Sequence, residues 1–295
     1  MNCVSQRYWS RALIGMYVVV QAGCATWLPT QNEPAPVVRD LVPVVKPRDA
    51  VGIETILVRL DEVQAQRLDE VWAQVDEQAL TPELRIALDK NGMRAGKVAS
   101  TLPALLEEWV RQTVQRVEES PLEQAGVAAD VTSYSQLWRC RANSRKELTI
   151  RRVNTGSACV FYHQEGTTKG HTFDTPHFLY AIHAAPVGDA AASVRLTPEL
   201  EHGDPVKKVS TGDGTIRPVT KRESIVWDPL AIDLRINKGD CIVIGPSHDS
   251  RGLGEHYFHT ITNEGAVQPV LLIVRLSESN QDEPFALPSA MVRTK

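Results

Sequence analysis

The sequence has no excess of basic residues and few aromatic ones. Its 295 residues include 32 Lys and Arg against 36 Asp and Glu, a formal net charge of -4, and 6% are aromatic. Without a basic excess the chain has little charge to neutralise a phosphate backbone, so we expect no nucleic-acid partner. The hydrophobic content of 42% and charged content of 23% are near the averages of globular domains, which argues against a disordered or polytopic membrane protein.

Cysteine is also scarce, with five residues in the chain. Two lie near the N-terminus, which leaves Cys140, Cys159 and Cys241 for the body. No pair has the C-x-x-C spacing of a zinc or redox site, and three cysteines leave at least one thiol unpaired. One disulfide is still possible, and Cys140 and Cys159 are the pair closest in sequence. Cys159 and Cys241 lie in apolar, strand-like runs, where we expect buried thiols.

Motifs for nucleotide binding and serine hydrolysis are missing. The chain has no G-x-x-x-x-G-K-[ST] phosphate loop and no G-x-S-x-G elbow. Gly252-Leu253-Gly254 lacks the third glycine of a dinucleotide site. The sequence therefore leads us to name no catalytic residue, no cofactor-binding residue and no cofactor.

What the chain does have is an N-terminal export signal. Arg7 and Arg11 precede a mostly apolar run that ends at Ala22. A membrane-spanning helix needs about 20 apolar residues, so this shorter run cannot cross a bilayer and is typical of a signal peptide. An ordinary cleaved signal peptide and an uncleaved anchor are the two simplest readings of such a segment.

The end of this signal, Val20-Gln21-Ala22-Gly23-Cys24, resembles the lipobox of bacterial lipoprotein signal peptides. The two small residues before Cys24 match, whereas Gln21 stands where the family has Leu, Val or Ile. The resemblance implies that the signal peptide, residues 1–23, is removed. It also implies that Cys24 is the lipid attachment site, through which the protein binds a membrane.

A lipid at Cys24 would place the protein in the cell envelope, on the periplasmic face. The next residue is Ala25 rather than the Asp that the family uses for inner-membrane retention, which is compatible with the outer membrane. Residues 24–50 then form a proline-rich tether, because each proline restricts its own φ and the residue before it. Such a segment reaches at most about 80 Å at 3.1 Å per residue.

Residues 51–120 are expected to form a small α/β domain with the order β-α-α-β-α. Helical and strand periodicities, together with capping residues, indicate its elements. They are a strand at Ile53–Leu60, an amphipathic helix from Asp61 to Val75, a helix from Thr81 that Asn91-Gly92 ends, a strand at Met93–Val98 and a helix at Leu102–Val117.

Residues 130–278 are expected to form a β-rich domain, and residues 279–295 a polar C-terminal tail. Turn signals such as Lys238-Gly239-Asp240 separate the candidate strands, where we expect hairpins. The candidate strands are Glu147–Val153, Ala158–His163, Phe178–Pro186, Ser193–Leu200, Ser224–Trp227, Ala231–Ile236, Cys241–Ile244, His256–Ile261 and Val270–Leu276. Strands that follow helices predict an α+β fold with a mostly antiparallel, sandwich-like sheet arrangement.

Two groups of histidines are candidate metal sites, although we assign no metal ligand. His171, Asp174 and His177 lie in an expected Gly/Thr/Pro-rich loop, where they could converge on an ion or act in acid-base chemistry. His256 and His259 lie three residues apart in an expected strand, where they would face opposite sides. Only a bulge or loop would then let these two rings share an ion.

Three segments between Val194 and Leu276 resemble the C-terminal β-domain of secretins, the outer-membrane rings of bacterial secretion systems. They are the strand Val194–Leu200, the turn and strand Ile236–Gly245 and the closing strand Leu271–Leu276. The chain as a whole resembles uncharacterised envelope lipoproteins of planctomycete-type bacteria. These resemblances imply an envelope location and, for the secretin motifs, assembly into rings.

The sequence thus predicts an exported, membrane-anchored lipoprotein of the bacterial cell envelope. We expect a non-enzymatic binding or scaffolding role, secretin-like in its β-domain, with an envelope protein as partner. The alternative is an exported metal-assisted hydrolase that uses His171, Asp174 and His177, or His256 and His259.

Overall fold

The computed structural model describes residues 50–119, 134–142, 144–188, 190–212, 215–249, 251–261 and 266–279. The chain divides into two units, Met1–Val45 and Lys46–Lys295, and every described residue belongs to the second. The signal peptide, Cys24, the tether up to residue 49 and the tail from residue 280 lie outside the described residues.

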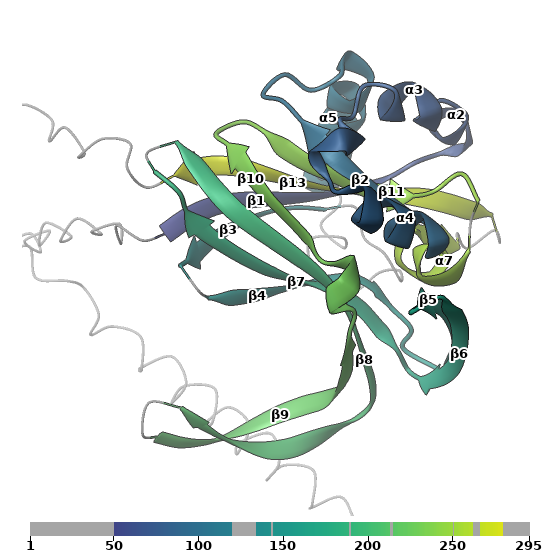
Figure 1. Cartoon of the computed structure of the whole chain (residues 1–295), viewed down its shortest axis with the longest axis vertical. Helices are drawn as coiled ribbons and strands as arrows, with labels where there is room; N and C mark the ends of the chain where they lie inside the picture. Colours follow the sequence, from purple (N-terminus) through teal and green to yellow (C-terminus); the bar gives the residue numbers. More distant parts are fainter. Residues whose placement is uncertain are drawn as a thin grey trace, which may run out of the picture. The chain divides into compact units, whose positions relative to one another are not determined.

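Sheet A runs through the middle of the unit (Figure 1). Its strand order is β2-β11-β13-β1-β3, with β12 also paired to β13, and all its pairings are antiparallel. Its strands are β1 (Ala50–Arg59), β2 (Met93–Val98), β3 (Tyr134–Arg141), β11 (Cys241–Pro246), β12 (His259–Ile261) and β13 (Val267–Ser279).

Sheet B is also antiparallel, with the order β10-β8-β7-β4 and with β9 paired to β8. A separate two-stranded hairpin joins β5 to β6. The strands are β4 (Arg145–Arg152), β5 (Ser157–Gln164), β6 (Thr167–Asp174), β7 (His177–Pro186), β8 (Ala191–Gly212), β9 (Thr215–Val226) and β10 (Ile232–Asn237).

The described helices lie mainly between β1 and β3, with one more between β11 and β12 and a short 3-10 turn between β9 and β10. They are α2 (Glu62–Gln66), α3 (Leu68–Trp72), the 3-10 turn η1 (Glu77–Ala79), α4 (Pro82–Lys90), α5 (Ala104–Glu119), the 3-10 turn η2 (Asp228–Leu230) and α7 (Gly252–Phe258). The capping predictions hold for two of them. The Asp61 carboxylate accepts from the Gln64 backbone N–H at the start of α2, and Thr81 Oγ1 accepts from Leu84 at the start of α4.

The central strands of sheet A are buried on both faces. Leu272 and Val274 of β13 belong to a core shared with sheet B, whereas Leu271 and Ile273 belong to a second core shared with helices such as α3, through Trp72. Neighbouring residues of one strand thus face different layers, which explains the unbroken apolar run of β13. The described part of the chain is therefore a mixed α+β fold of mostly antiparallel strands, as predicted.

Strands from both expected domains join sheet A. β1 and β2 come from residues 51–120, and β3, β11 and β13 come from residues 130–278. The β1 to β13 pairing alone runs from Val51 opposite Ser279 to Arg59 opposite Val270. A sheet with both faces covered buries more apolar surface than two separate small layers, which favours this shared arrangement.

The structure corrects several local predictions. The segment expected as a strand at His256–Ile261 begins as the helix α7, and only His259–Ile261 forms a strand. The expected helix from Asp61 to Val75 is two short helices, and Val63 is 68% exposed rather than buried. Lys238-Gly239-Asp240 is a turn, with Gly239 at φ 86°, but it links β10 in sheet B to β11 in sheet A instead of closing a hairpin.

Close backbone contact at the end of α4 explains why α7 is helical there. Asn91 is fully buried, and its side chain donates to the Ala87 and His163 carbonyls and accepts from the His163 N–H. The Gly254 N–H of α7 donates to the Asn91 carbonyl, and a Cβ on Gly254 would lie 1.8 Å from the Gly92 oxygen. This junction packs Tyr257 and Phe258 into the core, so tertiary packing overrides the strand preference of these aromatic residues.

Candidate functional site

Arg94 of β2 lies at the centre of the candidate site. Its guanidinium makes two hydrogen bonds to the Glu77 carboxylate, with Nε to Oε1 at 2.9 Å and Nη2 to Oε2 at 3.2 Å. Its Cζ lies 4.7 Å from the centroid of the Trp72 ring, within the range of a cation–π contact. Asp69 lies further away, with Oδ1 3.9 Å from Nη1. These contacts hold the Arg94 side chain in one position.

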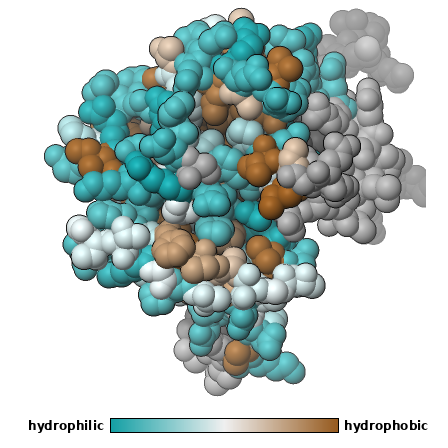
Figure 2. Space-filling model, turned by 90° about the vertical axis from the view of Figure 1, so that its right-hand side faces the viewer, coloured by the Kyte–Doolittle hydropathy of each residue, from teal (hydrophilic) through white to brown (hydrophobic). Residues whose placement is uncertain are grey.

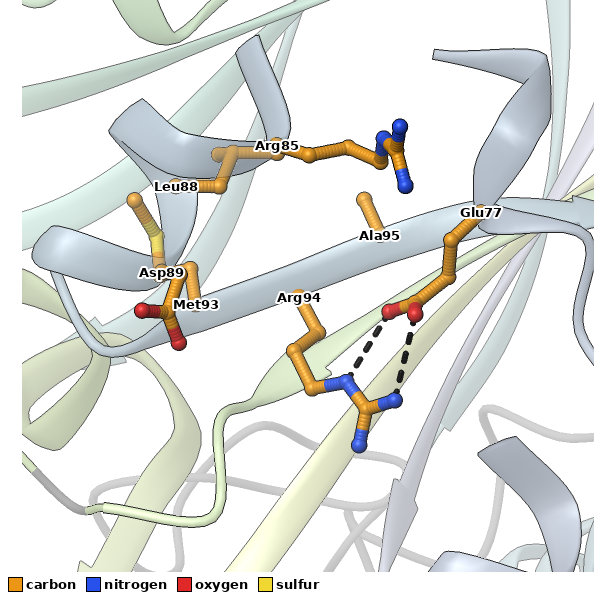
Figure 3. Close-up of a pocket in the computed structure, with 7 residues that line it drawn as sticks. All are labelled: Glu77, Arg85, Leu88, Asp89, Met93, Arg94 and Ala95. Carbon is orange, nitrogen blue, oxygen red and sulfur yellow. Dashed lines mark hydrogen bonds and ion pairs between the residues drawn. The ribbon is translucent and has the colours of Figure 1, made fainter. Parts of the chain in front are cut away.

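A first hollow of about 220 Å³ lies between β2, η1 and α4 (Figure 3). Arg94 and Glu77 form one side, with Arg85 and Asp89 of α4 on the other. The remaining lining side chains, Leu88, Met93 and Ala95, are apolar. Arg85 brings a second guanidinium, whose Nε is buried without a hydrogen-bond partner among the described residues.

A second hollow of about 300 Å³ also contacts Arg94. Its lining includes Leu68, Asp69, Trp72, Ser247, His248 and His259. Burial lowers the pKa of His259, while a hydrogen bond to the Gly254 backbone and the charge of Glu255 act in the opposite direction. The Ser247 hydroxyl donates to the Asp249 carbonyl at 2.9 Å, so its proton is engaged by the backbone.

Both hollows combine charged and polar side chains with apolar ones. Arg94 is already neutralised by Glu77, and the other charged groups are of both signs. The sequence does not predict this cluster, because Trp72, Glu77 and Arg94 come from three different elements. No fixed spacing links these three residues. Taken by itself, Trp72 is predicted to be a core residue.

The first predicted histidine group is not brought together. His171 and Asp174 lie on β6 and His177 begins β7, so all three are in strands rather than in one loop. The His171 ring stacks with Tyr162 at a centroid distance of 6.0 Å. His177 Nε2 lies 2.6 Å from Arg222 Nη1. Burial, with the charges of Arg222 and Arg152, lowers the pKa of His177 to about 4, so its neutral ring accepts a hydrogen bond from Arg222.

The second predicted pair is also divided between two surroundings. His256 stacks on Phe178 with ring centroids 5.3 Å apart, and its Nε2 donates to the Cys159 carbonyl at 3.1 Å. Burial lowers the pKa of His256. His259 instead lines the second hollow. Within the described ranges, no group of three or more His, Cys, Asp or Glu side chains is placed to hold a metal ion.

The three cysteines of the body are free thiols. The disulfide that the sequence left open between Cys140 and Cys159 is therefore not formed. Cys159 is exposed, contrary to expectation, because alternate residues of the two-stranded β5–β6 hairpin face solvent. Cys241 is buried as expected, and burial raises the pKa of its thiol to about 12, so it is unreactive at neutral pH.

Comparison with known proteins gives no relative. No protein-family model, no curated protein and no solved structure matches the chain. In the part of the chain that the structure describes, every helix is too short or too polar to cross a membrane.

Proposed function

We propose that the protein is an exported, lipid-anchored component of the bacterial cell envelope with a non-enzymatic binding or scaffolding role. The observation that carries the proposal is the basic start, short apolar run and lipobox-like end of the first 24 residues. The lipid on Cys24 binds the membrane, and the proline-rich tether separates the body from its surface. Ala25 favours the outer membrane in bacteria that sort lipoproteins by this position.

The body supports a binding role through the way its polar groups are used. Arg94 is neutralised by Glu77, His256 donates to a backbone carbonyl, and His177 accepts from Arg222. Groups held in this way stabilise the fold and are poorly placed to activate a nucleophile. The face in Figure 2 is mostly hydrophilic with scattered apolar groups, which suits contacts with a polar envelope partner.

Mass spectrometry of the N-terminal peptide from membrane fractions tests this proposal. We expect a peptide that begins at Cys24 and carries the mass of a diacylglycerol, and we expect Cys24→Ala to abolish both features. Cys3→Ala is the matched control, because Cys3 lies in the segment that is removed. Gln21→Leu restores the preferred lipobox residue and should raise the processed fraction. Protein with Met1 intact in the cytosol would reject the proposal.

A ring-forming role like that of secretins is a second candidate, favoured by the placement of the three secretin-like segments. They lie on strands of both sheets: Val194–Leu200 on β8, Ile236–Gly245 across β10 and β11, and Leu271–Leu276 on β13. Light scattering on the full chain in detergent is the test. A large cyclic oligomer supports this role, and a monomer rejects it.

A further inference from the structure

The distal part of strands β8 and β9 forms a two-stranded arm. β8 pairs with β7 only as far as Glu201, opposite His177, and with β10 only as far as Leu196. Beyond the irregularity between His202 and Val206, and among the residues that the structure describes, β8 pairs with β9 alone and β9 pairs with no other strand. We call this segment, which runs from residue 203 to residue 222 and is described at 203–212 and 215–222, the β8–β9 arm. Figure 1 shows it leading away from the other strands of sheet B.

Arg222 fixes the base of the arm to the rest of the molecule. Its Nε donates to the Gly203 carbonyl at 2.7 Å, and its Nη2 donates to the Thr175 carbonyl at 2.8 Å and to the Thr175 hydroxyl. Nη1 donates to His177 Nε2 at 2.6 Å. One guanidinium thus joins the arm to the connection between β6 and β7. The arm leaves the body in a defined direction.

The arm is basic in a chain that is acidic. Its sequence holds five basic residues against two acidic ones, a formal charge of +3, so the remainder of the chain carries -4 - 3 = -7. The basic residues are Lys207, Lys208, Arg217, Lys221 and Arg222, and the acidic ones are Asp204 and Asp213. Lys207 and Lys221 are exposed, as is Val206 with 50% of its surface accessible.

We propose that the β8–β9 arm binds the anionic headgroup surface of a lipid membrane. This inference rests on the proposed function, since a lipid on Cys24 would hold the arm near a bilayer and the tether would let it reach the surface. Cations near an anionic leaflet strengthen binding by about fivefold each at physiological salt. An exposed aliphatic residue such as Val206 adds contact with the interfacial region.

Vesicle co-sedimentation of the full chain with Cys24→Ala tests the arm without the lipid. The probes are vesicles of phosphatidylcholine alone and vesicles with three parts in ten of phosphatidylglycerol, at about 0.1 M salt. We expect preference for the anionic vesicles and a loss of affinity of at least tenfold on K207E/K208E/K221E. Any binding by the N-terminal segment is the same in every variant and cancels in the comparison.

The matched control is K90E/R111E/R139E, which changes the net charge equally but on α4, α5 and β3. We expect less than a twofold loss for it. Equal losses in both sets, or equal binding of the unaltered arm to neutral vesicles, would overturn the proposal. Absence of vesicle binding would also overturn it and would assign the basic arm to an acidic protein surface instead. If the charge reversals disturb folding, K207Q/K208Q/K221Q gives the same comparison.

The two proposals fail separately. Mass spectrometry of the N-terminal peptide detects the lipid on Cys24. Vesicle binding by the arm is measured separately, in protein that carries Cys24→Ala. An unlipidated protein whose arm still binds anionic vesicles would reject the anchor alone. A lipidated protein whose arm does not bind anionic vesicles would reject only the proposal about the arm.

Discussion

Strand β13 and the β8–β9 arm are both long antiparallel structures, yet their surroundings are opposite. β13 has β1 on one side and β11 on the other, with an apolar core on each face. The arm has two strands and, within the described ranges of the chain, no third neighbour. The side chains of β13 are mostly buried, whereas those of the arm are available to solvent or to a partner. Stability should therefore depend on sheet A and the elements packed on it, and the arm should tolerate change.

The largest effect should come from Gly254→Ala, at the junction that packs α7 against the end of α4. A Cβ there would lie 1.8 Å from the Gly92 oxygen, so the backbone of one segment must move. We expect a loss of about 4 kcal/mol in the free energy of unfolding, measured by urea denaturation. Gly166→Ala is the control: its Cβ meets nothing within 4 Å, and only its φ of 79° should cost about 1 kcal/mol. Similar losses for both would contradict the close contact.

The next prediction compares the truncation of a buried side chain with the truncation of an exposed one. Leu272→Ala removes a fully buried side chain from the core between the sheets and should cost about 3 kcal/mol. Val206→Ala removes a half-exposed side chain from the arm and should change stability by less than about 0.5 kcal/mol. Urea midpoints with an unchanged denaturant slope would give both values. A large loss at Val206 would show that the arm packs against other parts of the molecule.

Arg94→Ala, in the candidate site, should cause a loss of stability that is smaller than that at Leu272. The change removes a partly buried, two-bond ion pair with Glu77 and the contact with Trp72, so we expect a loss of about 1.5 kcal/mol. Arg67→Ala removes the exposed pair with Glu70 and should leave the melting temperature unchanged. If both variants melted alike, the Arg94 contacts would be no stronger than those of a surface pair.

The smallest effect is a pH dependence at the base of the arm. The lowered pKa of His177, about 4, means that the unfolded chain takes up a proton at higher pH than the folded one. Its neutral form therefore stabilises the fold above pH 6.5, and that contribution declines as pH falls toward 4. We expect about 1 kcal/mol across this window, since water screens the half-buried ring. His177→Gln should flatten this part of the pH profile, and an unchanged profile would contradict the lowered pKa of His177.

The alternative of a metal-assisted hydrolase is separated from the binding role by metal content. Purified protein that kept stoichiometric zinc or iron, and lost it on His171→Ala or His256→Ala, would favour the hydrolase. Elemental analysis after dialysis gives the answer. Because the two rings lie among different partners, we expect neither variant to change the metal content.

Sequence patterns predicted the elements whose local signals agree with their packing. The caps at Asp61 and Thr81, the end of α4 at Asn91-Gly92 and the apolar run of β13 are all found as expected. Strand β6 was missed because its residues are mostly polar, and strand β3 was missed because its apolar residues do not alternate with polar ones. The helix α7 was missed because its aromatic residues favour strands in isolation.

The candidate site could not be predicted for a related reason. Trp72, Glu77 and Arg94 meet only once β2 has paired with β11 and the helices have packed on sheet A. The histidines show the opposite case, in which residues close in sequence lie apart in the structure. His171 and His177 lie on different strands, and His256 lies in a helix whereas His259 lies in a strand. Proximity in the chain was a poor guide to proximity in space for both sets.

The pairing of β1 with β13 has a consequence for biosynthesis. The first and last strands of the described body are neighbours, so sheet A cannot close until β13 has been translated. Contacts between distant parts of a chain also form slowly. A nascent protein that stays open for so long is well suited to being threaded through a translocation channel, since a body completed early would have to be pulled apart before it crossed.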